Sequence, residues 1–191
     1  FIVDLDKKIQ YDTWPRKSLV LPIRPSDAEH QMHRLLERYS DQVWKEAGAR
    51  GDDRARLVSI ILRKRALSSA GSLRSSVARR IELLAQATRV DAEQLALPLD
   101  DEDSLQDDEP LGAMATPGLN DPVRERRWLA AIAEAARAAA RTETKARALL
   151  RLLRRVHEPA IVFTEYRDTL TLLARGLAET RRRLVLLHGG L

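Results

Sequence analysis

The sequence contains no cysteine among its 191 residues. This absence excludes disulfide bonds, thiolate metal sites and cysteine nucleophiles, and it is compatible with a reducing compartment such as the cytoplasm. No apolar run approaches the roughly 20 residues that a membrane-spanning helix needs. No basic segment followed by an apolar stretch opens the chain, as it would in a signal peptide. We therefore expect a cytoplasmic protein without a membrane partner.

Sequence motifs for catalysis are also missing. The chain has no G-x-x-x-x-G-K-[ST] phosphate loop, no H-E-x-x-H zinc motif and no G-x-S-x-G nucleophile motif. Ser68 and Ser69 have no nearby histidine in the sequence that would activate them. His30 and His33, with Glu29 and Glu37 nearby, have a spacing that could hold a metal ion. Two histidines three residues apart on a surface helix, without a third ligand, are more often solvated. We expect neither a catalytic centre nor a metal site in this chain.

Charge is distributed in three blocks. Residues 1–90 carry 18 Lys and Arg against 11 Asp and Glu, residues 91–122 carry ten acidic and no basic side chains, and residues 123–191 carry 15 basic against seven acidic ones. The net charge of +5 therefore hides two basic blocks separated by an acidic one. Basic blocks of this strength favour a polyanionic partner such as nucleic acid. The alternative is that the arginines are solvated helix formers without a partner.

The first half of the chain predicts a connector followed by a helical block over residues 26–97. Residues 17–24 predict a short strand at a sheet edge, because Pro22 cannot donate a ladder hydrogen bond. Ser26 with Glu29 three residues later predicts a capping box at a helix start. That helix has one apolar face and ends in the glycine-containing loop 48–53. Two further helices are expected over 54–67, buried on most sides, and over 73–88, after a turn at 68–72.

An acidic segment over residues 98–122 predicts a disordered linker. Seven of the ten residues from 100 to 109 are acidic, and proline and glycine punctuate the stretch. Such a segment cannot bury enough apolar area to offset its ordering entropy. An acidic mimic that occupies a basic groove is the alternative. Asp121 followed by Pro122 predicts a new helix start, and two helices are expected over residues 123–157.

The last 34 residues change from helical to mixed periodicity. Residues 160–163 and 184–187 predict two short strands covered on both faces, with an amphipathic helix between them. This order predicts one right-handed parallel βαβ unit. Because one such unit is not a stable domain, we expect the sheet to continue beyond Leu191.

Ligands bind at the carboxyl ends of the strands in open parallel sheets. Those ends are Thr164–Asp168 and His188–Gly190. A threonine hydroxyl, helix-start amides and Arg167 suit a phosphate group. The alternatives are that Thr164 and Asp168 only cap the helix and that the glycine pair is an ordinary turn.

Several segments resemble one family. Residues 160–170, with the sequence A-I-V-F-T-E-Y-R-D-T-L, and residues 186–191, L-L-H-G-G-L, look like the opening of the second RecA-like lobe of superfamily-two helicases. The similarity is greatest to the Swi/Snf-type, HepA/RapA-like translocases, in which the first run resembles motif IV. Weaker similarity to family segments lies in residues 14–23, 29–39, 62–81 and 144–150.

The resemblance implies an internal piece of a larger α/β protein of the P-loop NTPase type. Residues 1–25 would end the first lobe, 26–97 would form a helical insertion, 98–122 a linker, 123–157 a helical lead-in, and 158–191 the start of the second lobe. The implied activity is ATP-driven translocation on double-stranded DNA or remodelling of nucleoprotein, in the bacterial cytoplasm at the nucleoid. ATP and magnesium would bind motifs before Phe1 and after Leu191, and not this chain alone.

The resemblance also suggests which residues border the nucleic-acid track. Motif IV lies beside that track in the family, and the expected contacts are Thr164, Glu165, Tyr166, Arg167, Lys145, His188 and Gly189. The alternative function is a complete, non-catalytic basic helical module that binds nucleic acid or a protein partner.

Overall fold

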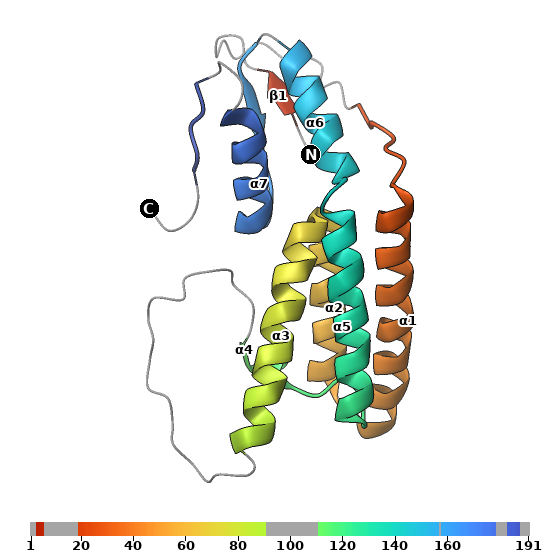
Figure 1. Ribbon diagram of the computed structural model, residues 1–191. Coiled ribbons are helices and arrows are strands. Elements are labelled where there is room, and N and C mark those ends of the chain that lie inside the picture. Colours follow the sequence, from red (N-terminus) through yellow and green to blue (C-terminus); the bar gives the residue numbers. More distant parts are fainter. Residues whose placement is uncertain (1–2, 6–18, 91–110, 157, 179–182, 188–191) are drawn as a thin grey trace.

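The computed structural model describes residues 3–5, 19–90, 111–156, 158–178 and 183–187. It is mostly helical, as expected. Four long helices pack side by side in a bundle: α1 (Asp27–Arg50), α2 (Asp53–Ser68), α3 (Ala70–Val90) and α5 (Pro122–Ala139). Figure 1 shows a smaller group of elements at one end of this bundle, made of α6 (Thr144–Arg155), β2 (Ala160–Val162), α7 (Arg167–Ala178) and β1 (Val3–Leu5).

The start and the end of α1 follow the expected chemistry. The Ser26 hydroxyl accepts a hydrogen bond from the Glu29 amide, and the Glu29 carboxylate accepts one from the Ser26 amide at 2.6 Å, so the capping box is confirmed. Gly51 ends the helix with a φ of 67°, a backbone conformation that favours glycine. The expected apolar face is buried, with Met32, Leu36, Tyr39 and Val43 in the core.

The next two helices are joined more tightly than expected. Ser69 alone interrupts the helical backbone, in an extended conformation, so the predicted five-residue turn is wrong. The prediction that α2 is buried on most sides is also wrong, because Leu57 and Ile60 are each 41% exposed. The buried face of α2 is carried by Val58 and Leu62, with small residues beside them.

The segment before α5 is ordered where the structure describes it. Residues 111–121 contain α4 (Leu111–Ala115), and the side chains of Met114 and Leu119 are fully buried in the bundle. The prediction of a disordered linker over 98–122 is therefore wrong for this part, and residues 98–110 lie outside the described residues. Asp121 caps α5 and Pro122 is its first residue, as predicted.

A buried ion pair explains why this segment packs against the helices. The Arg80 guanidinium lies 2.6 Å from the Glu125 carboxylate, and both side chains are at most 1% exposed. Arg80 also donates to the backbone carbonyls of Met114 and Thr116. The Glu125 carboxylate accepts the amides of Gly118 and Leu119, at 2.9 and 3.1 Å. The backbone of residues 114–119 thus satisfies two charges inside the bundle.

The strands differ from the predicted parallel unit. β2 pairs antiparallel with β1, with Val3 opposite Val162. Residues 183–187 form no strand, and Val185 and Leu187 are more than 70% exposed. The parallel βαβ unit is therefore not formed among the described residues. Ile161, at 52% exposed, also shows that β2 is not covered on both faces.

The expected edge strand over 17–24 is wrong for its described part. Residues 19–24 pair with no strand in the part of the chain that the structure describes, and Leu19 and Val20 are at least 80% exposed. Pro22 removes one backbone donor from this segment. In the described parts of the chain, no helix is long and apolar enough to cross a membrane.

Candidate nucleic-acid interface

The turn between β2 and α7 contains most of the residues selected from the sequence. β2 ends at Val162 and α7 begins at Arg167, so Thr164 to Tyr166 lie in the connection, as predicted. The first turn of the helix is closed by a bond of 3.0 Å from the Leu170 amide to the Tyr166 carbonyl. The predicted strand-to-helix turn is present even though the second strand of the unit is not.

This turn is attached to the bundle at the break between α2 and α3. The buried Thr169 hydroxyl lies 2.7 Å from the Ser68 hydroxyl and donates to the Ser69 hydroxyl at 3.1 Å. The Asp168 carboxylate lies 3.8 Å from the guanidinium of Arg65. These contacts hold the start of α7 against α2, so the turn has a defined position beside the bundle.

Tyr166 faces the bundle. The guanidinium of Arg65 lies over its ring, 4.1 Å from the centroid, and the Arg65 side chain is buried. This is a favourable cation–π distance. The ring face that Arg65 covers is therefore closed to a nucleobase, and Tyr166 has a positioning contact that sequence reasoning did not anticipate.

Lys145 reaches the same region from the first turn of α6. Its ammonium group donates to the Leu67 carbonyl at 3.1 Å, at the negative end of the α2 dipole. Partial burial lowers the pKa of Lys145. An anion next to this group would oppose that shift, because it favours the charged form.

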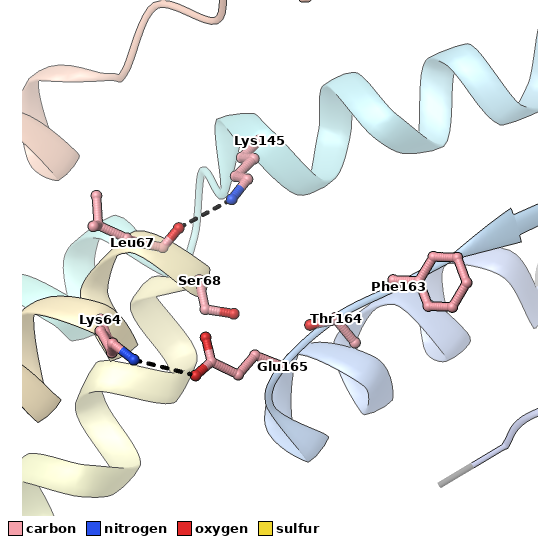
Figure 2. Close-up of a pocket in the computed structure, with 7 residues that line it drawn as sticks. All are labelled: Lys64, Leu67, Ser68, Lys145, Phe163, Thr164 and Glu165. Carbon is pink, nitrogen blue, oxygen red and sulfur yellow. Dashed lines mark hydrogen bonds and ion pairs between the residues drawn. The ribbon is translucent and has the colours of Figure 1, made fainter. Parts of the chain in front are cut away.

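These elements enclose a hollow of about 250 Å³ between α2, α6 and the turn. Figure 2 shows its lining side chains, with Thr164, Glu165 and Ser68 turned toward the space between α2 and the turn. Lys64 lies 3.7 Å from the Glu165 carboxylate. The hollow is lined by Lys64, Leu67, Ser68, Lys145, Phe163, Thr164 and Glu165.

The hollow unites residues that the sequence suggested separately. Thr164 and Glu165 come from the turn, and Lys145 comes from a helix about 20 positions earlier in the chain. Lys64 and Phe163 were missed. Lys64 lies in the segment 62–81, whose resemblance to the family suggested no binding residue. Phe163 was expected to be buried, because the strand over 160–163 was expected to be covered on both faces. Arg167 is half-buried at the start of α7, and His188 and Gly189 lie outside the described residues.

Two carboxylates fix the junction that positions Lys145. Glu29 of α1 accepts bonds from the amide and the hydroxyl of Thr144, at 2.9 and 3.0 Å. Glu143, which has a positive φ of 37°, accepts the Gly71 amide at 2.9 Å at the start of α3. Both carboxylates are at most 8% exposed. The start of α6 is therefore tied to α1 and, through Glu143, to α3.

The two carboxylates are expected to affect stability with opposite signs. Burial alone would raise the pKa of Glu29. The hydrogen bonds from Ser26 and Thr144 outweigh this effect, so the pKa lies below its ordinary value of 4.5. Burial raises the pKa of Glu143 above 4.5 despite the Gly71 bond. At pH 7 we expect Glu29→Gln to destabilise the fold by about 1–2 kcal/mol, because a charge-assisted cap is lost. Glu143→Gln should stabilise it, because the costly buried charge is removed.

The pH dependence follows from these pKa shifts. The contribution of the Glu29 charge is full above pH 4.5 and is lost as the pH falls through its lowered folded-state pKa. The penalty for the Glu143 charge is absent below pH 4.5 and grows as the pH rises through its raised folded-state pKa. Urea denaturation at pH 7, 5 and 3 measures both. If both variants change the free energy of unfolding in the same direction at pH 7, the roles given to Glu29 and Glu143 are wrong.

Comparison of the chain with protein-family models, with curated proteins and with solved structures finds no match in any of the three.

Proposed function

We propose that this chain is part of an ATP-dependent translocase of superfamily two, of the Swi/Snf-type, HepA/RapA-like group. In this proposal it contributes contacts to the track for double-stranded DNA. The β2–α7 region would begin the second RecA-like lobe, and the bundle would be the helical insertion. The protein would act on DNA or nucleoprotein in the bacterial cytoplasm at the nucleoid.

One observation carries the proposal. The motif IV-like turn and Lys145, which were selected from separate segments of the sequence, line one hollow on the surface. Lys64 adds a second ammonium group to the same lining. Two lysines and the Thr164 hydroxyl around a hollow suit the phosphate backbone of nucleic acid, because phosphate contacts supply most of the non-specific affinity.

ATP hydrolysis is not assigned to this chain. The sequence has no phosphate-binding loop, so the proposal gives no residue of this chain a contact to ATP or magnesium. Both would bind other parts of the translocase.

The proposal is tested by measuring DNA affinity against salt. Fluorescence anisotropy of a labelled 20-base-pair duplex is recorded at several salt concentrations for the wild type, Lys145→Gln, Arg167→Gln and the exposed control Lys45→Gln. For each residue of the track we expect the slope of log K against log salt to fall by about 0.9, since each contact releases counterions from one phosphate. The control should not change it. Wild-type slopes in both track variants, or no salt-dependent binding by the wild type, would contradict the proposal.

A non-catalytic helical module that binds a protein partner is the second candidate. It is favoured by the continuous core of the bundle, which α1, α2, α3, α4 and α5 share. It is also favoured by the exposed apolar side chains of residues 184–187. The same titration separates the two candidates, because a protein-binding module has no reason to show a salt-dependent affinity for DNA that track residues control.

A further inference from the structure

We propose that the hollow between α2, α6 and the β2–α7 turn binds one backbone phosphate of a nucleic-acid strand. Phe163 would pack against the adjoining nucleoside, and Glu165 would act as a counter-ion that the phosphate displaces from Lys64. The inference rests on the proposed function and deepens it. It assigns binding roles to Lys64 and Phe163, which the resemblance did not select.

The charge of the hollow favours a single anion. Lys64 approaches from α2 and Lys145 from α6, while Glu165 is the one acidic side chain in the lining. Lys64 and Glu165 are 60% and 62% exposed and 3.7 Å apart. An ion pair of such exposure is weak in water. A phosphate therefore competes for Lys64 without having to break a buried contact.

The size and the hydroxyl groups also suit a phosphate. About 250 Å³ lies below the roughly 300–1,000 Å³ typical of pockets for whole small molecules. The Thr164 and Ser68 hydroxyls border the space (Figure 2), and hydroxyl groups are common donors to phosphate oxygens. The Thr169 hydroxyl donates its proton to Ser69, so the Ser68 hydroxyl donates to Thr169, and Thr164 is left as the hydroxyl donor for a phosphate.

Phe163 favours a nucleic-acid strand over a free phosphate. It is 62% exposed although it directly follows the apolar strand β2. It lines the hollow at the end away from Lys64 and Glu165 (Figure 2). Inorganic phosphate has no apolar group that would cover this ring. The sugar beside the bound phosphate would, and that sugar is accessible in a duplex as well as in a single strand.

Glu165 is expected to weaken binding in the wild type. Its carboxylate lies in the same hollow as the proposed phosphate, and like charges repel. Removing its charge frees Lys64 for the ligand. Removing the charge of Lys64 should weaken binding instead. Opposite changes in affinity for these two substitutions are specific to the proposed site.

The experiment measures binding of a 12-nucleotide single strand and of a duplex by anisotropy. We expect Glu165→Gln to tighten binding about threefold to tenfold, and Lys64→Gln to weaken it by a similar factor with a salt slope lower by about 0.7–0.9. Phe163→Ala should weaken binding of both the single strand and the duplex by about threefold to tenfold, because less apolar surface is buried against the sugar. The matched controls Glu82→Gln, Lys45→Gln and Ile161→Ala should bind as the wild type does. Glu82 and Lys45 are exposed outside the hollow, and Ile161 is an exposed residue of β2.

Several results would overturn the inference. If Arg167→Gln weakens binding while Lys64→Gln and Phe163→Ala do not, the track stands and the phosphate site is wrong. If the wild type binds no nucleic acid, both proposals are wrong. NMR titrations with inorganic phosphate and with ATP at matched ionic strength test the other phosphate sources. Shifts of the Thr164 amide that saturate at lower concentrations of either one than of the oligonucleotide would assign the hollow to a free phosphate compound.

Discussion

Replacing Glu125 with alanine is expected to lower the free energy of unfolding by about 3–5 kcal/mol, because it leaves a buried guanidinium without its partner. The Glu125 carboxylate lies 2.6 Å from Arg80 and accepts the Tyr39 hydroxyl at 2.7 Å. It also accepts the amides of Gly118 and Leu119. One substitution therefore leaves four donors without this acceptor inside the bundle. Burial raises the pKa of Tyr39 strongly, so its hydroxyl stays protonated as a donor.

Urea denaturation followed by circular dichroism measures this loss. Glu125→Gln keeps a carbonyl oxygen as an acceptor, so its loss should be smaller than that of Glu125→Ala. The matched control is Glu134→Ala on the same helix, which removes an exposed ion pair with Arg137 and should leave the midpoint unchanged. We expect the 111–119 segment of Glu125→Ala to lose protection from hydrogen exchange first. A Glu125→Ala midpoint equal to that of the control would contradict the role given to the buried pair.

The buried pair of Arg80 and Glu125 could not be predicted from the sequence. Apolar spacing and capping residues predicted α1, α2, α3, α5 and α6, because those signals act within a few residues of one another. Arg80 and Glu125 are 45 positions apart and are polar, so periodicity assigns both to the surface. Their contact is what orders residues 111–121, and the prediction of a linker over that segment followed from composition alone. A long-range contact between charged residues leaves no local pattern in a single sequence.

The strands were harder to predict for a similar reason. β2 was recognised from its apolar run, but its partner β1 lies more than 150 residues earlier in the chain. The expected partner at 184–187 has the same apolar composition and is exposed instead. Composition identifies a segment that is able to pair, but it does not specify the partner strand.

The candidate site was predicted in part. Thr164, Glu165 and Lys145 were selected by resemblance, and they line one hollow. The contribution of α2 was not foreseen, because nothing in sequence indicates that Lys64 and Arg65 approach the turn from the bundle. These two neighbours on α2 differ in burial: Lys64 is exposed at the hollow, and Arg65 is buried beneath the turn. In the proposed site, Lys64 would supply charge to the ligand, and Arg65 would support the residues that contact it.

Replacing Arg65 with alanine is expected to separate the turn from the bundle. The side chain contacts the ring of Tyr166 at 4.1 Å, the Asp168 carboxylate at 3.8 Å and the Ser72 hydroxyl at 3.2 Å. Losing this buried packing and these polar contacts should cost about 2–4 kcal/mol. Because the contacts to Tyr166 and Asp168 join α2 to the turn and to the start of α7, hydrogen exchange should accelerate in α7 more than in α1.

Arg63→Ala is the control that distinguishes positioning of the turn by Arg65 from the effect of its positive charge. Arg63 is exposed on the same helix two residues earlier, so both variants remove one positive charge from α2. If Arg65 acts by positioning the turn, Arg65→Ala should weaken DNA binding by about tenfold, a loss of about 1.4 kcal/mol, while Arg63→Ala should change it little. Arg65→Met retains an apolar side chain, so its free energy of unfolding should lie between those of Arg65→Ala and Arg63→Ala. Equal binding losses in the two alanine variants, with α7 protected in both as in the wild type, would mean that Arg65 contributes only charge.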